Sequence, residues 1–542
     1  MDADKSNDGN GRKRGMMGDK KTGKTGVVLF RNMILLCLTV MLCSGCQGKV
    51  TEENRTENVA TLRMIVLGNE PEEGMTELYA ELDALTIPEL GCVLRFEFIP
   101  WGNERKQLNI AAISGEYDLM PMGVFSDYST LVEKNAFLDL NEYLHLVPDM
   151  VEHYKYYDEE YLKNSETNGG LYGIPQYGSG ALQYTSEGFF YREDLRKEWG
   201  LEEITDLETM EAYLYRAKEE PRYQDEALIT DNRIWTSLWI VLSEGKYLEV
   251  GSTLETPFAV VAAENPNVVL NRLETPEFQE VLEYLKKWKK DGILDDNMLA
   301  LSDNEGERGR SLMREDRKPC ESNAPIWTAN NTYIPDLIAR NPDWEFGFFL
   351  YITANKEQLY ASRPVASSRI SVSSKTKYPE IAIKLLEKIH TDKRYYDLFL
   401  YGVEGVHYHL VDGKVSRAGI SGSNKYGINV AGDGLLNSGE VAVNEQWGAV
   451  VDRVLAWEEA ATREAMISPL DGFVFTPTGL DKVMDAMEKA RILYFQPLVC
   501  GYYEGEGDIE EAVEELRRKG LDQYLDNIQR SLIEYMENQK GE

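Results

Sequence analysis

Apolar residues follow two different periods along the chain after residue 60. Compact apolar runs of strand length occupy residues 62–67, 93–99 and 118–122. Between these runs, apolar residues recur every three or four positions at 75–85 and 108–113, which is helical spacing. Strands separated by helices predict a parallel sheet with crossover helices.

The loops that follow the three predicted strands are candidates for a binding site. Ligands of parallel α/β sheets bind at the carboxyl ends of the strands. The side chains that we select in these loops are Glu70, Trp101 and Asp127. An ordinary loop or core position is the alternative for each of them.

A shorter apolar run precedes this region, at residues 33–42, and follows a basic flank. A run of about 10 residues is too short to span roughly 30 Å of bilayer hydrocarbon as a helix. It has the length of the hydrophobic region of a signal peptide. Ser44 and Gly45 supply the small residues that a signal peptidase needs, and Cys46 follows them. This arrangement resembles a bacterial lipoprotein box, in which the cysteine carries a diacylglycerol and becomes the first mature residue.

The lipoprotein box departs from the usual pattern at one position. Cys43 stands where a leucine is usual, and Leu42 lies one place further away. A plain signal peptide or a short uncleaved anchor is the alternative, and the CxxC spacing of Cys43 and Cys46 lacks the strand–helix context of a redox site. We expect residues 1–46 to form a lipoprotein signal peptide and the polar stretch 47–60 to form a flexible tether.

The charge balance excludes several classes of partner. The chain carries 92 acidic and 58 basic residues, for a formal net charge of −34. This excess argues against nucleic acid, which demands a basic surface. It also disfavours electrostatic docking on anionic lipid, so the lipid on Cys46 would hold the protein at the membrane by itself. Cys92, Cys320 and Cys500 are too widely spaced for a disulfide framework or a metal knuckle, and we expect no metal and no cofactor.

Five short motifs follow one another in the order that is typical of one bacterial family. They are Ser-Gly-Glu-Tyr-Asp-Leu at 114–119, Ala-Phe-Leu-Asp-Leu at 136–140, Gly-Gly-Leu-Tyr-Gly-Ile-Pro at 169–175, Gly-Phe-Phe-Tyr-Arg-Glu-Asp-Leu at 188–195 and Tyr-Gly-Val-Glu-Gly-Val-His-Tyr at 401–408. Each is weak alone, but the resemblance covers nearly all of residues 60–540. The chain therefore resembles the bacterial extracellular solute-binding proteins of family 1, and the last motif resembles a branch of long lipoproteins.

This resemblance implies a two-lobe α/β fold of the type II periplasmic-binding-protein kind. Each lobe would hold a mostly parallel sheet flanked by helices, with a ligand cleft between the lobes. The first lobe would comprise residues 61–175 plus about 365–415, and the second about 176–364 plus about 440–542. The protein would be a monomeric receptor of an ABC importer, lipid-anchored on the extracytoplasmic face of the cell membrane, and would deliver a small-molecule solute to the permease subunits.

The family pattern also suggests ligand-binding residues. One aromatic residue follows a turn in the second lobe and matches Trp327, and another begins the helix after the late crossing and matches Trp447. We interpret both as stacking platforms whose replacement abolishes binding with little change in melting temperature, with core packing as the alternative. Tyr177 is a further candidate. Glu404 is either a ligand contact or part of a rigid turn between two glycines.

The aromatic content indicates the class of solute. The chain contains 31 tyrosines and 9 tryptophans, which suits a site that stacks flat rings on sugar faces. Oligosaccharide is therefore the predicted solute, and oligopeptide is the alternative. A sensory or adhesive lipoprotein without transport, and a secreted carbohydrate enzyme, are the other classes left open. We expect no enzymatic activity: the one P-loop match, at 18–25, lies in the basic leader without a preceding strand and is a chance match.

Overall fold

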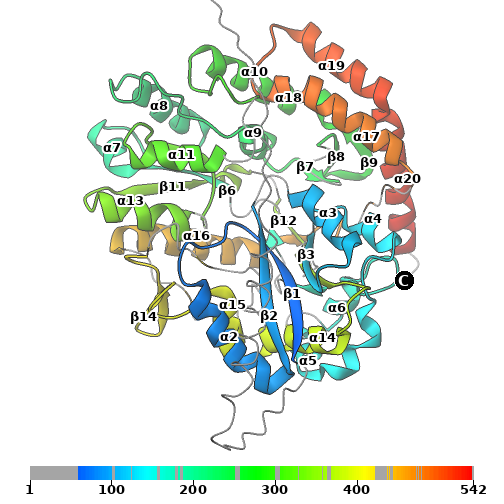
Figure 1. Cartoon of the computed structure of the whole chain (residues 1–542). Coiled ribbons are helices and arrows are strands. Elements are labelled where there is room, and N and C mark those ends of the chain that lie inside the picture. The colour runs from blue at the N-terminus through cyan, green and yellow to red at the C-terminus, as the bar shows by residue number, and fades with distance from the viewer. Residues whose placement is uncertain are drawn as a thin grey trace, which may run out of the picture. The chain divides into compact units, whose positions relative to one another are not determined.

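The computed structural model describes residues 59–539 except for short internal gaps, and this part belongs to one compact unit, Asn58–Glu542 (Figure 1). The residues outside the description are 1–58, 101–103, 124, 156–158, 177–180, 183–186, 251–256, 300–304, 327–328, 357, 363–367, 421–425, 427–435, 437–438, 440–443, 472, 474, 476, 478 and 540–542. The predicted signal peptide with Cys46 lies among them, as do Trp101, Tyr177 and Trp327. Within the described ranges, no helix has both the length and the apolar character needed to cross a membrane.

The first lobe is built on a five-stranded sheet. Its strands, in order across the sheet, are β2 (Cys92–Ile99), β1 (Ala60–Leu67), β3 (Leu119–Gly123), β13 (Ser368–Val372) and β4 (Ile174–Pro175). β1 pairs in parallel with β2 and β3. Helices α2 (Met75–Leu90) and α3 (Glu104–Ser114) connect these three strands, so the predicted alternation of strands and helices is confirmed.

The core of the first lobe joins two distant parts of the chain. Buried apolar residues from 60–174 pack with residues from 370–426, of which Tyr426 is the last. The remaining elements of this lobe are α4 (Tyr128–Glu133), η1 (Leu140–Glu142), η2 (Leu144–Leu146), α5 (Pro148–Lys155), α6 (Tyr161–Asn164), α14 (Pro379–Thr391), α15 (Lys393–Leu400), β14 (His409–Val411) and β15 (Lys414–Ser416).

The sheet of the second lobe has three strands, in the order β10 (Cys320–Pro325), β6 (Glu187–Arg192) and β11 (Phe346–Leu350). Both pairings are antiparallel, so the prediction of a mostly parallel sheet is wrong for this lobe. The reason is the path of the chain. β6 follows the first passage of the chain out of the first lobe, and it runs antiparallel to both neighbours. In the first lobe, β13 likewise returns from the second lobe and runs against β3 and β4.

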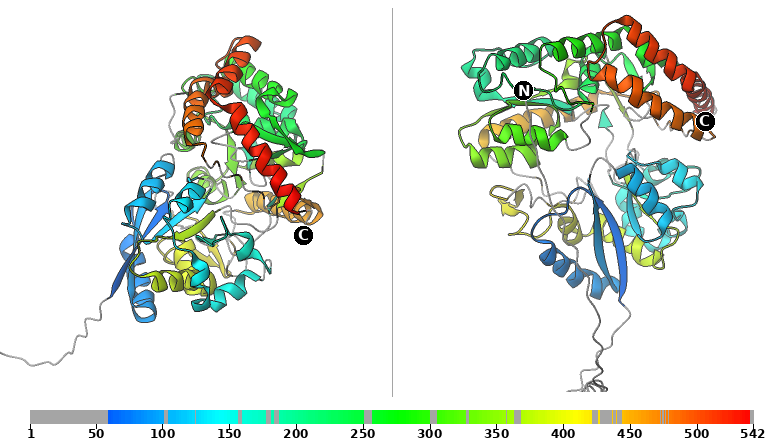
Figure 2. Two further views of the ribbon diagram at one scale, coloured as in Figure 1. Left: turned by 90° about the vertical axis from the view of Figure 1, so that its right-hand side faces the viewer. Right: turned by 45° about the horizontal axis from the view of Figure 1, so that its top comes forward.

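Helices and a small separate sheet complete the second lobe. They are α7 (Glu193–Glu198), α8 (Leu207–Lys218), α9 (Ile234–Ser243), β7 (Tyr247–Glu249), β8 (Ala259–Ala262), β9 (Asn265–Asn271), η3 (Arg272–Glu274), α10 (Pro276–Lys290), α11 (Glu305–Arg314), η4 (Ala329–Tyr333), α13 (Ile334–Arg340), η5 (Tyr351–Ala354), α16 (Glu445–Glu464), α17 (Asp481–Ala490), η7 (Arg491–Phe495), α18 (Gln496–Val499), α19 (Glu506–Lys519) and α20 (Leu521–Gln539). One large apolar cluster draws on most of these elements and includes Trp235 and Trp239, which lie four residues apart on α9. Helices α17, α19 and α20 pack on one another, and α20 also packs on β9 (Figures 1 and 2).

A third, three-stranded sheet forms where the chain passes between the lobes. β5 (Ala181–Leu182) lies on the first passage and pairs antiparallel with β12 (Tyr360–Ser362), which lies on the return passage. β16 (Met466–Ile467) pairs in parallel with the other side of β12. The passages are therefore tied together by their backbones.

Two glutamine side chains close the edges of sheets. Gln446 of α16 accepts a hydrogen bond from the Phe346 backbone N–H of β11 (3.1 Å) and donates one to the Phe346 carbonyl (2.8 Å). Gln529 of α20 accepts from the Val269 N–H of β9 (2.8 Å) and donates to the Asn267 carbonyl (2.8 Å). An edge strand leaves such backbone groups unpaired, so each glutamine satisfies one donor and one acceptor.

We predict that Gln446→Ala lowers the free energy of unfolding by about 1–3 kcal/mol, because two backbone groups of β11 lose their partners. Urea denaturation monitored by circular dichroism measures this change. Gln523→Ala is the matched control, because Gln523 lies on the exposed face of α20. Equal stability of the two variants would contradict the edge-closing role.

Candidate functional site

The carboxyl ends of β1, β2 and β3 lie at one edge of the first-lobe sheet, because these strands run in parallel. The Gly68 N–H donates to the Ile99 carbonyl (2.9 Å) and links the ends of β1 and β2. Glu70 follows this link and is exposed. The predicted loops therefore share one edge, and Glu70 presents a carboxylate there.

Asp127 lies at the same edge, before the first turn of α4, and its side chain is 44% exposed. Its carboxylate accepts hydrogen bonds from Arg105 and from the Asn109 amide, both on α3. The Asn109 side-chain oxygen accepts from the Asp127 backbone N–H in return (3.3 Å). The carboxylate is thus held in place and still faces solvent, with a guanidinium beside it. Such a pair can accept from and donate to neighbouring hydroxyl groups.

The three aromatic candidates Trp101, Tyr177 and Trp327 lie outside the described residues. The flanks of Trp327 are described: Ile326 and Ala329 are fully buried, and β10 ends at Pro325. Pro325 pairs with Glu187, the first residue of β6. This end of β10 therefore adjoins the entry of the chain into the second lobe.

Trp447 occupies the core, which is at odds with its prediction as an exposed platform. The residue is fully buried, and its ring meets Phe190 edge-on with centroids 5.7 Å apart. Its indole N–H donates to the side-chain oxygen of Asn330 (2.9 Å), which is 6% exposed. The N-cap Asn444 accepts from the Trp447 backbone N–H (2.8 Å), and Val450 is buried one turn further along α16. The first turn of this helix thus faces inward, and protein covers the ring.

A buried polar cluster near this region was not found by sequence reasoning. Glu321 of β10 and Lys318 form an ion pair of 3.0 Å, with 5% and 1% of these residues exposed. Lys318 also donates to the Thr230 hydroxyl (3.0 Å). Asp231 is buried and pairs with Arg233 (2.6 Å), whose side chain is 52% exposed and reaches solvent.

Burial raises the pKa of Glu321, and Lys318 opposes this shift. Burial also raises the pKa of the Tyr333 hydroxyl, which lies in the electrostatic range of Glu321. The Arg310 guanidinium carbon lies 5.6 Å from the centre of the Tyr333 ring. These groups come from separate segments between residues 230 and 333, so no motif of fixed spacing in the sequence predicts the cluster. The segment 320–325, Cys-Glu-Ser-Asn-Ala-Pro, has no apolar run that would mark Glu321 as buried.

The Tyr-Gly-Val-Glu-Gly-Val-His-Tyr motif forms the rigid turn that its glycines predicted. Gly402 and Gly405 have φ values of 84° and 82°, which suit glycine. The Val403 N–H donates to Nδ1 of His407 (3.0 Å), and the His407 ring is fully buried against Tyr426. Glu404 is exposed on this turn, and its contact with a ligand stays a prediction.

Comparisons with known proteins were made for the whole chain. No protein-family model matches it. A carbohydrate ABC transporter substrate-binding protein of Streptococcus pneumoniae serotype 4 is 24% identical over 520 residues, which cover 94% of this chain and 98% of that protein. This relative confirms the resemblance to solute-binding proteins.

Solved structures share the fold at lower sequence identity. The N-glycan transport solute binding protein NgtS of Streptococcus pneumoniae, in complex with Man1GlcNAc, has a TM-score of 0.66 at 20% identity and covers 88% of this chain and 100% of its own. The alginate-binding protein AlgQ2 without calcium ion has a TM-score of 0.63 at 16% identity, with coverage of 88% and 98%. The substrate-binding protein FusA of S. pneumoniae, in complex with kestose, has a TM-score of 0.61 at 14% identity, with coverage of 88% and 100%. The chain has the two-lobe α/β fold of extracellular solute-binding proteins.

We predict that Trp447→Phe lowers the free energy of unfolding by about 1–3 kcal/mol, because buried Asn330 loses the indole donor. Guanidinium denaturation measures the change. The control is Trp288→Phe: that indole is also fully buried, but it donates to Glu211 (2.7 Å), which is partly exposed and can be hydrated instead. A smaller loss for Trp447→Phe than for the control would contradict this assignment.

A pH dependence follows from His407. Burial lowers its pKa below the usual value of about 6.5, so the unfolded chain binds the proton more readily than the folded one. The free energy of unfolding should therefore fall as the pH drops below about 6.5. His407→Gln should flatten this slope whatever its overall stability, whereas His409→Gln, at the exposed neighbour, should keep it. Equal slopes in wild type and His407→Gln would refute the effect.

Proposed function

We propose that the protein is the extracytoplasmic receptor of an ABC importer and that it binds an oligosaccharide between its two lobes. The observation that carries the proposal is the relative named for carbohydrate ABC transport, which aligns with 94% of this chain. Two proteins of the same fold have been solved with saccharides, one with Man1GlcNAc and one with kestose. On this proposal the chain is a binding protein and not an enzyme, and its ligand leaves unchanged.

The two lobes are proposed to follow the predicted segments. Residues 61–175 plus about 365–415 form the first, and about 176–364 plus about 440–542 form the second. The separate buried clusters support this division. Because a cleft between lobes takes contacts from both, a bound sugar can favour the closed form over the open one.

The proposed contacts combine a fixed polar edge with aromatic faces. In the first lobe, Asp127 with Arg105 offers an acceptor and a donor in fixed geometry, and Glu70 and Trp101 belong to loops at the same edge. In the second lobe, Trp327 is the proposed stacking platform, at the end of β10. Aromatic rings bind the apolar faces of sugars, while charged groups take the hydroxyls.

Tyr177 and Glu404 are secondary candidates for ligand contact. Tyr177 follows buried Gln176 in the sequence. Trp447 leaves the proposed site because its ring is buried, and its role is to support Asn330.

Membrane attachment is proposed through Cys46. Cleavage before this residue and addition of a diacylglycerol would leave residues 47–59 between the lipid and β1, which begins at Ala60. The receptor would then stand on the extracytoplasmic face as a monomer, next to the permease subunits that receive its cargo.

We predict that the chain from residue 50 onward is stabilised by one class of oligosaccharide and by no short peptide. A ligand at about 100 times its dissociation constant adds about 2.7 kcal/mol to the free energy of unfolding, which a thermal-shift screen detects. Mass spectrometry of the released ligand should show it intact. A shift with peptides alone, or recovery of a cleaved ligand, would overturn the proposal.

Binding of the same oligosaccharide to variants tests the proposed ligand site. Asp127→Asn and Trp327→Ala should each weaken the affinity for that oligosaccharide by about tenfold or more, which corresponds to about 1.4 kcal/mol. Asp149→Asn is the control, because Asp149 is exposed on α5 of the same lobe. Calorimetry gives the dissociation constants. Unchanged affinity in both site variants would remove this edge and this platform from the site.

A further inference from the structure

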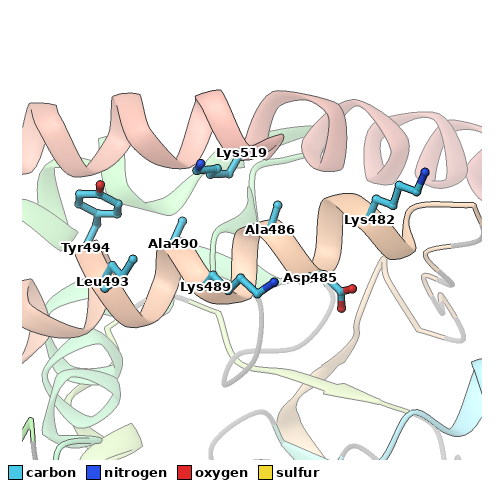
Figure 3. Close-up of a pocket in the computed structure, with 8 residues that line it drawn as sticks. All are labelled: Lys482, Asp485, Ala486, Lys489, Ala490, Leu493, Tyr494 and Lys519. Atoms are coloured by element: carbon cyan, nitrogen blue, oxygen red, sulfur yellow. The ribbon is translucent and has the colours of Figure 1, made fainter.

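A groove of about 470 Å³ lies between α17 and α19 (Figure 3). Ala486 and Ala490 form part of its floor, four residues apart on α17, and their small side chains leave the space open. Lys482 and Lys489 line it from the same helix, and Lys519 lines it from the last turn of α19. The groove is therefore apolar at its base and carries ammonium groups on both sides, and Asp485 of α17 adds one carboxylate to the lining.

These three lysines differ from the arginines on α19 and directly after α17. Arg491 pairs with Glu488 (2.8 Å), Arg518 with Glu514 (2.5 Å) and Arg517 with Glu274 (2.5 Å). Among the residues that the structure describes, no carboxylate lies within ion-pair distance of the three lysines that line the groove. In a chain with a formal net charge of −34, a groove lined by three lysines and one carboxylate, Asp485, has a net positive lining.

The end of the groove also exposes large apolar side chains. Leu493 lines the groove and is 66% exposed, and its neighbour Ile492 is 53% exposed. Tyr494 adds an aromatic face to the lining. Exposed apolar surface bordered by polar and charged side chains is typical of a protein-binding surface.

We propose that this groove is the docking site for an acidic amphipathic segment of the importer's membrane permease, an inference that rests on the function proposed above. Carboxylates of the partner would meet Lys482, Lys489 and Lys519, and an apolar side chain would cover Leu493. An acidic receptor repels an acidic partner at long range, which weakens their encounter. The lysines of the groove make the electrostatic interaction attractive at this one place. It thereby orients the receptor and favours docking at the groove.

Two other occupants fit less well. An anionic bilayer attracts each basic side chain by about 1 kcal/mol, and the net negative charge of this chain opposes that attraction. A second copy of the chain would need an interface of about 1,000 Å² or more, whereas the groove accepts only a short segment.

The test uses the charge-reversal variant K482E/K489E/K519E in the full chain. Cells that lack the wild-type receptor and produce this variant should take up the labelled oligosaccharide about tenfold or more slowly than cells with the wild type. The affinity of the purified variant for the oligosaccharide should be unchanged, because none of the three lysines belongs to the proposed ligand site. The matched control is K134E/K290E/K377E, which makes the same change of net charge at three exposed lysines elsewhere and should restore normal uptake.

Each alternative outcome has its own readout. Normal uptake by K482E/K489E/K519E overturns the docking site and leaves the proposed function intact. If the wild type binds the oligosaccharide but does not restore uptake, the import function itself fails, and the docking site with it. Binding of the wild type, and not of the variant, to vesicles of phosphatidylcholine and phosphatidylglycerol would assign the groove to a lipid surface. A dimer seen by sedimentation in the wild type alone would assign it to a second copy.

Discussion

Backbone pairing between the two passages of the chain is the constraint on which the rest of the structure depends. β5 on the outward passage and β12 on the return passage form one antiparallel pair, and β16 pairs in parallel with the other edge of β12. Because the bonds join backbone groups, the passages stay together whatever side chains they carry. The direction of β6 and β13 follows from the same path, since each strand enters its sheet from the opposite lobe. A connection of so few paired residues suits a hinge.

Three strands of the first lobe could be predicted from local patterns, whereas the strand pairing of the second lobe could not. β1, β2 and β3 follow one another with one crossover helix between each pair, so apolar periodicity was sufficient. The strands of the second sheet are separated by long helical stretches, and no local pattern carries their direction of pairing. Trp447 shows the same limit for a side chain. A tryptophan in the first turn of a helix has the same sequence signature whether it faces a cleft or the core, and here its partner Asn330 lies 117 residues away.

Charged side chains in the interior of the second lobe have partners of opposite charge, whereas some at its surface do not. Buried charges are paired, as in Glu321 with Lys318 and in Arg272 with Glu249, where the guanidinium carbon also lies 4.8 Å from the Trp239 ring centre. Leaving such a group alone in the interior costs several kcal/mol, on the order of 3–5, so pairing is expected there. At the surface this free-energy cost is absent, and cations can lie there without a carboxylate partner. The proposed ligand edge and the lysine groove both carry charged side chains at the surface. Asp127 is held by α3 and still faces solvent, and the groove lysines also face solvent.

A crystal structure of the chain from residue 50 onward, with the oligosaccharide found by screening, tests the central claim most directly. The account predicts density for an intact sugar between the two lobes, with a hydroxyl within hydrogen-bond distance of the Asp127 carboxylate and one sugar face against the Trp327 ring. Density for the sugar on the outer surface of one lobe, or none at ligand concentrations that stabilise the protein, would contradict it.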